Sequence, residues 1–252
     1  YALPVTIKSV EGIGVLQSAK TYYYVFRGAS LINVVCNISR NRAYPDFKND
    51  SKFNNLTENT MEILFKANSF PNTLNTLMGI ESNYLLRIGD ATIPNNQLQV
   101  ATSVNNCTSA DLQLESGKWY HVAVAFNKGN VKVYINGVEK LSGSTGKSSV
   151  SLGAKHTNEE DGSRCFWVGY SYKDDRYFDG VVSEVRIWNR ALTAEEIQAT
   201  NHFYTIEPES EGLIAYWKFD EGSGTVAKDY SVSGYDLTIE KEPKWESVSL
   251  PQ

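Results

Sequence analysis

The sequence predicts an all-β protein in which two antiparallel sheets pack against each other as a sandwich. Three observations support this fold class. Segments of alternating apolar and polar residues recur along the chain, Gly-containing and Asn-containing turns separate them, and aromatic residues make up 12% of the 252 residues. Alternation with a period of two indicates a strand with one buried face, and many short strands joined by turns are typical of sandwiches.

Eight segments carry the strand pattern most clearly. They are residues 60–67, 84–89, 97–103, 119–126, 131–137, 166–171, 181–188 and 213–219. The segment WYHVAVAF (119–126) is apolar on both faces, so we expect it to be covered on both sides. Asn136-Gly137 ends the next segment and predicts a hairpin turn, because both residues tolerate positive φ.

The alternation also assigns side chains to the core. We expect the sandwich interior to contain Val122, Val124, Ile187 and Trp217. The tryptophans Trp119 and Trp188 alternate with apolar residues as well, so we also interpret them as core residues.

One short helix is predicted within residues 190–201. Thr193 is placed as the N-cap, and Glu196 three residues later completes a capping box. Leu192 and Ile197 are placed for a hydrophobic staple across this start. We expect the helix to be structural and to carry the chain over one end of the sandwich.

Composition excludes several functions. A net charge of -5 and a pI near 5.3 argue against a nucleic-acid partner, and no apolar run approaches the roughly 20 residues of a transmembrane segment. The chain opens on a strand-like segment, so no signal peptide is predicted. Neither the cysteines nor the scattered histidines have zinc-ligand spacing, so no transition-metal site is expected. At most one disulfide can form among Cys36, Cys107 and Cys165.

Three phrases indicate a family. They are SGKWYHVAVAFNKGNVKVYINGVEKLSG, FDGVVSEVRIWNRALTAEEI and GLIAYWKFDEGSGTVAKDYS. Together they resemble the laminin-G-like, concanavalin A-like jelly roll of pentraxins, laminin-type modules and many bacterial carbohydrate proteins. The resemblance covers roughly residues 55–240 and implies a jelly-roll sandwich. The third phrase usually opens such domains but lies near the end of this chain, which suggests a permuted connection.

The first residues are different in character. The segments LPVTIKSVEG and KTYYYVFRG resemble the last strands of an Ig-like module, which predicts an N-terminal segment 1–30 and a jelly-roll domain 31–252. In surface lipoproteins of Bacteroidetes-type bacteria, such a module often precedes a laminin-G-like domain. This resemblance implies an extracellular or outer-membrane location, capture of oligosaccharides or polysaccharides, and other glycan-uptake proteins as partners.

No catalytic motif stands out. Glucanases on this fold use a Glu-x-Asp-x-Glu strand that holds two carboxylates about 5–5.5 Å apart for a retaining mechanism, and the sequence lacks it. Its nearest imitation, Glu207, Glu209 and Glu211, is predicted to lie in a loop because of Pro208. We therefore expect no enzymatic activity, with a glycoside hydrolase as the least favoured alternative.

The acidic segment near the C-terminus has two interpretations. Asp220, Glu221 and Asp229 can supply oxygen ligands to one structural Ca2+, an ion that related domains often carry. Asp229 can equally cap a turn by accepting backbone N–H bonds. The sequence leaves both interpretations open, and neither makes these carboxylates catalytic.

Sugar binding needs flat rings beside hydrogen-bonding groups. Two stretches supply both kinds: ESNYLLRIGDATIPNN and GYSYKDDRYFDG. The candidate ligand-binding residues are Tyr84, Arg87, Asp90, Tyr170, Tyr172, Asp175, Arg176 and Tyr177. Core packing is an equal alternative for Tyr170. We therefore expect a non-catalytic carbohydrate-binding module, with a protein-adhesion or structural laminin-G-like domain as the alternative.

Overall fold

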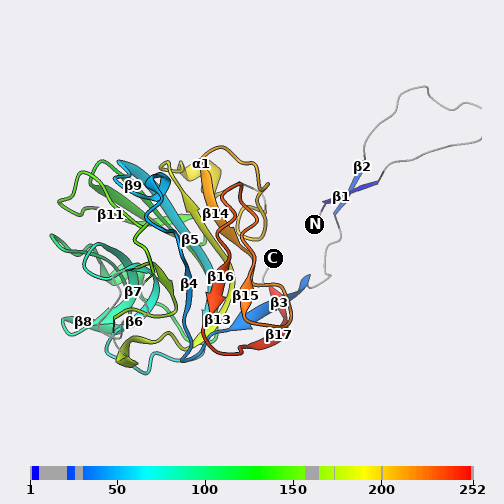
Figure 1. Cartoon of the computed structure of the whole chain (residues 1–252), viewed down its shortest axis with the longest axis horizontal. Coiled ribbons are helices and arrows are strands. Elements are labelled where there is room, and N and C mark those ends of the chain that lie inside the picture. The colour runs from blue at the N-terminus through cyan, green and yellow to red at the C-terminus, as the bar shows by residue number, and fades with distance from the viewer. Residues whose placement is uncertain are drawn as a thin grey trace, which may run out of the picture.

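Two large antiparallel sheets face each other across one hydrophobic core, as the sequence predicts (Figure 1). The computed structural model describes residues 2–5, 22–25, 31–156, 165–172, 174–199 and 201–250, and it describes side chains from Asn33 onwards except that of Asp174. All strand pairs in both large sheets are antiparallel among these residues. The protein is therefore an all-β jelly-roll-like sandwich with one helix.

The first sheet has eight strands in the order β11-β10-β9-β5-β13-β3-β17, and β14 pairs with β13 as well. Its strands are β3 (Leu31–Asn37), β5 (Glu58–Ala67), β9 (Trp119–Asn127), β10 (Asn130–Ile135), β11 (Val138–Ser144), β13 (Gly180–Trp188), β14 (Leu213–Trp217) and β17 (Lys244–Leu250). The predicted turn at Asn136-Gly137 joins β10 to β11, and both residues have positive φ.

The second sheet has seven strands in the order β15-β16-β4-β12-β6-β7-β8. They are β4 (Ala43–Pro45), β6 (Asn75–Ile80), β7 (Tyr84–Asp90), β8 (Ile93–Thr102), β12 (Trp167–Val168), β15 (Val226–Ala227) and β16 (Leu237–Ile239). The segment predicted as a strand over 166–171 thus pairs through two residues only. The sequence pattern did not indicate β6, which is buried along its whole length.

The predicted interior residues lie between the two sheets. Val122, Val124, Ile187 and Trp217 are fully buried in the main core cluster. Trp188 is buried too, but in a second cluster on the other side of its sheet. Trp119 is only half-buried at the start of β9, so its assignment to the core is wrong. A strand terminus leaves one side of such a ring without a packing partner.

The outer face of the eight-stranded sheet is itself covered. Residues 189–212 connect β13 to β14 and include the helix α1 (Ala194–Ile197). Thr193 and Glu196 form the predicted capping box, with both of its hydrogen bonds present. Leu192 and Ile197 pack with apolar residues of β9, β10, β13 and β14 in the second cluster. This explains why WYHVAVAF is apolar on both faces.

The N-terminal strands form a separate pair. β1 (Ala2–Val5) and β2 (Tyr22–Val25) make a two-stranded antiparallel sheet, and within the described part of the chain they pair with neither large sheet (Figure 1). β3 begins at Leu31, where the second domain is predicted to start. The rest of the predicted N-terminal strands lies outside the described residues, and the Ig-like assignment stays a prediction.

The described residues also form three short 3-10 helices: η1 (Ser51–Phe53), η2 (Ala110–Leu112) and η3 (Asp174–Arg176). Cys36, Cys107 and Cys165 are all buried. Within the described residues, no helix has the length and apolar character needed to cross a bilayer.

Candidate functional site

The structure brings the two predicted sugar-binding stretches together beside the seven-stranded sheet. Arg176 of η3 forms an ion pair with Glu81, which lies in the turn between β6 and β7, at an N–O distance of 2.8 Å. Ser171 shares a 2.7 Å hydrogen bond with Thr76 of β6 and also donates to Glu81. These contacts join segments about 90 residues apart in sequence into one surface.

The exposed part of this surface contains aromatic, basic and acidic groups. Tyr172 is 41% exposed, and the Arg176 guanidinium lies 5.4 Å from its ring centroid. Asp175 is exposed, whereas Tyr177 is half-buried and its carbonyl accepts a hydrogen bond from Asn72. We call Glu81, Tyr172, Asp175, Arg176 and Tyr177 the tyrosine surface. An exposed ring flanked by charged hydrogen-bonding groups is the combination that sugar binding requires.

A row of polar side chains crosses the outer face of the same sheet. Thr76, Arg87 and Gln99 are opposite one another on β6, β7 and β8, while Leu86 beside them points into the core. Arg87 donates to Gln99 Oε1 through Nε at 2.8 Å and forms an ion pair with Asp90. Burial lowers the pKa of Arg87, although Asp90 and Glu81 oppose that effect.

Arg87 is 7% exposed, so its guanidinium is used within the protein. Its contacts hold the side chain of Asp90, which is 23% exposed, and that of Gln99 in place. Arg87 therefore positions neighbouring groups in this structure, and Asp90 is the more accessible of the two candidates.

An aromatic cluster lies next to this polar row. It contains Tyr44, Trp167, Tyr170 and Tyr177. The Tyr170 ring centroid is 5.2 Å from that of Trp167 and 4.8 Å from that of Tyr177, and Arg42 lies over both Trp167 and Tyr170. Tyr170 is 5% exposed, so it supports Tyr177 from within the cluster.

Sequence reasoning missed Trp167 as a residue of this site. A signal was available, because Val168 is apolar and lies in the core, so strand alternation places Trp167 on the outer face. Across the sheet Trp167 is opposite Gly79, which has no side chain to compete for that space.

Tyr84 does not belong to the site. It is fully buried in the sandwich interior, and its ring centroid is 5.8 Å from that of Phe126 on the opposite sheet. Its assignment as a ligand-binding residue is therefore corrected. Tyr84 and Arg87 are an odd number of positions apart on one strand, so their side chains point to opposite faces.

The acidic C-terminal segment adopts a capped loop. Asp229 Oδ1 accepts hydrogen bonds from the backbone N–H groups of Tyr216 and Ser231, and Oδ2 accepts one from Tyr235, at 2.8–3.0 Å. Both carboxylate oxygens are thus occupied, which matches the turn-capping interpretation and leaves Asp229 poorly placed as a calcium ligand. Glu221 Oε2 is buried and meets no hydrogen-bond donor among the described residues, so it is the better candidate oxygen.

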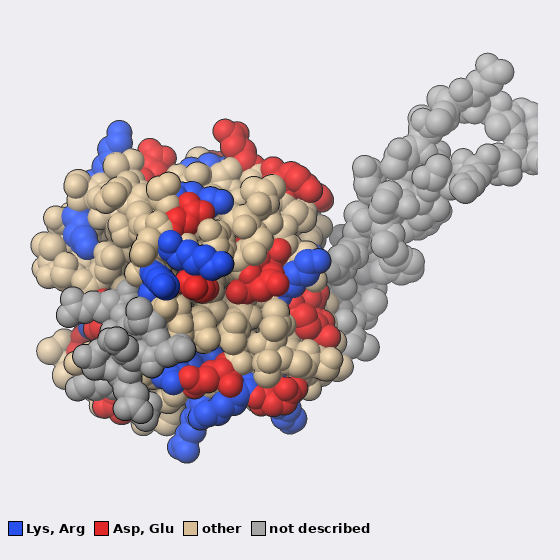
Figure 2. Space-filling model, viewed as in Figure 1, with Lys and Arg blue, Asp and Glu red and all other residues tan. Residues whose placement is uncertain are grey.

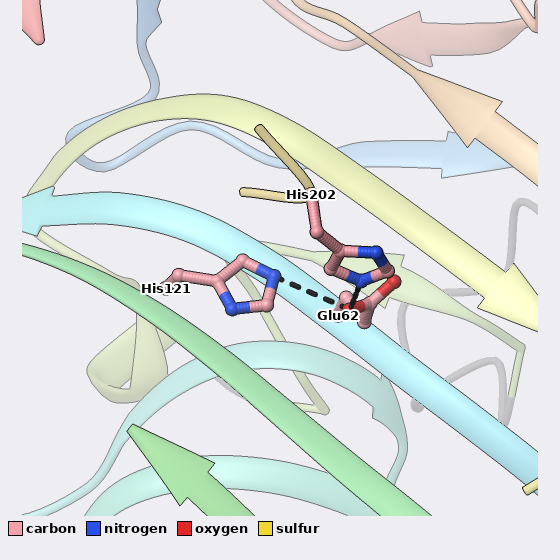
Figure 3. A group of neighbouring side chains, drawn as sticks. All are labelled: Glu62, His121 and His202. Atoms are coloured by element: carbon pink, nitrogen blue, oxygen red, sulfur yellow. Dashed lines mark hydrogen bonds and ion pairs between the residues drawn. The ribbon is translucent and has the colours of Figure 1, made fainter. Parts of the chain in front are cut away.

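A second cluster of ionisable groups lies under the connection that carries α1. Glu62 of β5, His121 of β9 and His202 meet there, all at least 95% buried (Figure 3). Glu62 Oε1 is 2.6 Å from His202 Nε2 and 3.3 Å from His121 Nε2, and Oε2 accepts a hydrogen bond from the Trp188 indole at 2.7 Å.

The pKa values follow from burial and charge. Burial opposes ionisation of Glu62, but the two histidines and Arg186 outweigh it and hold the pKa of Glu62 well below its usual value. Burial lowers the pKa of His121, which stays neutral and stacks on Phe203 with ring centroids 4.5 Å apart. Arg186 Nη1 is 3.7 Å from Glu62 Oε2.

Two histidines and a carboxylate form a set of side chains that can bind zinc. The sequence predicted scattered histidines, and this prediction is wrong because His121 and His202 lie close together in the folded protein. The geometry between Glu62 and His202 is nevertheless that of hydrogen bonding. Ligands of one tetrahedral zinc at bonds of about 2.0–2.1 Å lie roughly 3.3 Å apart, whereas Glu62 and His202 are 2.6 Å apart. The guanidinium of Arg186 also repels a cation. We interpret the cluster as a buried network that fixes the described part of the connection between β13 and β14 to the sheet.

Charge on the visible face is mixed. Figure 2 shows basic and acidic side chains interspersed, without a large patch of one sign. This face therefore offers no broad basic surface for a polyanion, and the net charge of the chain is -5.

Comparison with known proteins agrees with the architecture. Residues 41–198 match the family described as the Concanavalin A-like lectin/glucanases superfamily, in its laminin-G form. A crystal structure of a candidate carbohydrate binding protein from Bacteroides ovatus is 26% identical, with a TM-score of 0.74 over 95% of this chain. This chain spans 66% of the length of that protein.

Two more distant structures share less. One is domain 4 of an extracellular arabinanase from Geobacillus stearothermophilus in complex with arabinotriose, at 22% identity and a TM-score of 0.47, covering 65% of this chain and 74% of that one. The other is a pentraxin from Limulus polyphemus, at 15% identity and a TM-score of 0.45, covering 68% and 82%. Comparison with curated protein sequences finds no match.

Proposed function

Since this chain belongs to the Concanavalin A-like lectin/glucanases superfamily, we propose that it is a non-catalytic carbohydrate-binding module that binds its ligand at the tyrosine surface. The observation that carries the proposal is the exposed ring of Tyr172 beside the Arg176–Glu81 ion pair. The ring can stack on the apolar face of a sugar, and the charged groups can hydrogen-bond its hydroxyls.

The similarity to the Bacteroides ovatus protein supports a sugar ligand, because it extends over nearly the whole chain. We further propose that the chain belongs to a protein that captures oligosaccharides or polysaccharides at the cell surface. Other glycan-uptake proteins are its expected partners, and an extracellular or outer-membrane location follows from that role.

The absence of enzymatic activity is part of the proposal. In the tyrosine surface Glu81 is paired, since it binds Arg176 and Ser171. A retaining hydrolase needs two carboxyl groups on either side of the scissile bond, one of which holds a proton near neutral pH. Glu207, Glu209 and Glu211 lie in a loop, as predicted, and are exposed.

A glycan array tests the proposal. The wild-type protein should bind a defined set of oligosaccharides, and Tyr172→Ala and Tyr177→Ala should weaken that binding while the Tm stays nearly unchanged. Trp119→Ala, which removes a half-buried ring from the other sheet, is the matched control and should bind as the wild type does. If the protein binds no glycan, the protein-adhesion alternative is favoured. If it releases reducing sugar from a glycan, the hypothesis that it is a glycoside hydrolase is favoured.

A further inference from the structure

The edge of β13 is shared by two strands that diverge, and a cavity lies where they separate. β3 pairs with Val181 and Val182, and β14 pairs with residues 185–188. Ser183 and Glu184 pair with neither β3 nor β14. A β-bulge interrupts the pairing of β13 with β5 at the same point. Bulges at such positions redirect a side chain and end the pairing locally.

The cavity at this fork has a volume of about 260 Å3. Asn33 and Val34 of β3 line one side, and Lys218 and Asp220 after β14 line the other. Glu184 contributes from the sheet, and Tyr204 and Thr205 contribute from the covering connection. Drug-sized ligands occupy cavities of about 300–1,000 Å3, so this one has room for a single small molecule.

Its lining is polar and nearly balanced in charge. Glu184 is 5% exposed, and its Oε2 accepts a hydrogen bond from Arg186 Nη2 at 2.7 Å. Lys218 offsets the charge of Asp220, and its ammonium lies 4.7 Å from the ring centroid of Tyr230. The lining residues carry amide, hydroxyl and carboxyl groups, with little excess charge to attract an ion.

We propose that this fork cavity is a second binding site, separate from the tyrosine surface, for one neutral sugar residue. A polyhydroxylated ring matches the cavity in size and offers hydroxyls to the carboxyl and amide groups around it. Tyr204 is among the lining residues, and aromatic side chains are groups that sugars contact.

The affinity should depend on pH through Glu184. The groups that face it are Arg186, the hydroxyl of Tyr216, Lys218 and the cavity residue Asp220, with Glu62 behind Arg186. Burial raises the pKa of Glu184 to about 7 despite the opposing effect of Arg186. Sugar hydroxyls donate more strongly to a carboxylate than to a neutral acid, so binding should strengthen from pH 6 to pH 8.

Saturation-transfer NMR with D-glucose, D-galactose, D-mannose, D-xylose and L-arabinose tests the site. At least one should bind the wild type with a millimolar Kd. Thr205→Trp, a change at an exposed position, should block the cavity and weaken binding at least about tenfold, which corresponds to 1.4 kcal/mol. Trp119→Ala, which removes a half-buried ring that belongs to neither site, should leave monosaccharide binding unchanged.

A second variant tests the same site in case Thr205→Trp does not fold. Glu184→Gln keeps the shape of the side chain, and its monosaccharide affinity should no longer change between pH 6 and pH 8. The proposal is overturned if no monosaccharide binds the wild type, or if a folded Thr205→Trp binds as well as the wild type does. Because glycan-array binding depends on Tyr172, either result leaves the proposed function to be judged separately.

Discussion

Replacing Glu184 should change how the stability of the protein depends on pH. The residue is 95% buried, and burial raises its pKa from 4.5 to about 7. Between these two values the folded state holds a proton that the unfolded state releases, so the free energy of unfolding falls as pH rises. At 1.36 kcal/mol per pKa unit, the difference between 4.5 and about 7 corresponds to about 3 kcal/mol, most of which is lost between pH 5 and pH 8.

Urea unfolding at pH 5 and pH 8 measures this effect in the wild type and in Glu184→Gln. The glutamine can still accept the hydrogen bond from Arg186, and it does not titrate. Between the two pH values, the wild type should therefore lose about 2–3 kcal/mol more stability than the variant does. Titration of other groups cancels in this comparison, because both proteins contain them. Equal losses would refute the assignment of a buried, protonated Glu184.

Three further outcomes are expected. His121→Phe keeps the stacking on Phe203 but removes the titrating ring. Because the pKa of His121 is lowered in the folded state, the wild type should lose stability below about pH 6.5. Unfolding measurements from pH 6.5 to pH 5 should show a smaller loss of stability in the variant. Asp229→Ala should cost about 3 kcal/mol in unfolding free energy because three backbone N–H groups lose their acceptor, and Asp229→Asn should cost less; equal costs would contradict the capping role. If Glu221 holds a structural Ca2+, excess chelator should lower the Tm of the wild type and not that of Glu221→Gln, whereas an unchanged wild-type Tm would rule the ion out.

The sequence was most informative where the signal is local. Alternation in residues 119–126 predicted both the strand and its two buried faces, because each side chain's orientation follows from its neighbours along one strand. The capping box at Thr193 was predictable for the same reason. Tyr84 shows the limit of this approach. The composition of its segment suggested a ligand-binding residue, but its position on the strand directs its side chain into the core.

Contacts distant in sequence could not be predicted. Glu62 and His202 are 140 residues apart and meet only because the connection after β13 folds back over the sheet. The ion pair between Arg176 and Glu81 depends in the same way on β12 pairing with β6. The fork cavity arises from competition between β3 and β14 for one edge of β13, which no pattern within a single strand reveals.

Calorimetric titration of the double variant Tyr172→Ala/Tyr177→Ala with the best array oligosaccharide tests the central claim most directly. Two stacked rings at about 1 kcal/mol each predict an affinity roughly thirtyfold below that of the wild type, with an unchanged Tm. Thr205→Trp serves as the control for the fork cavity and should retain most of the oligosaccharide affinity. Wild-type affinity in the double variant would contradict the claim that the tyrosine surface binds carbohydrate.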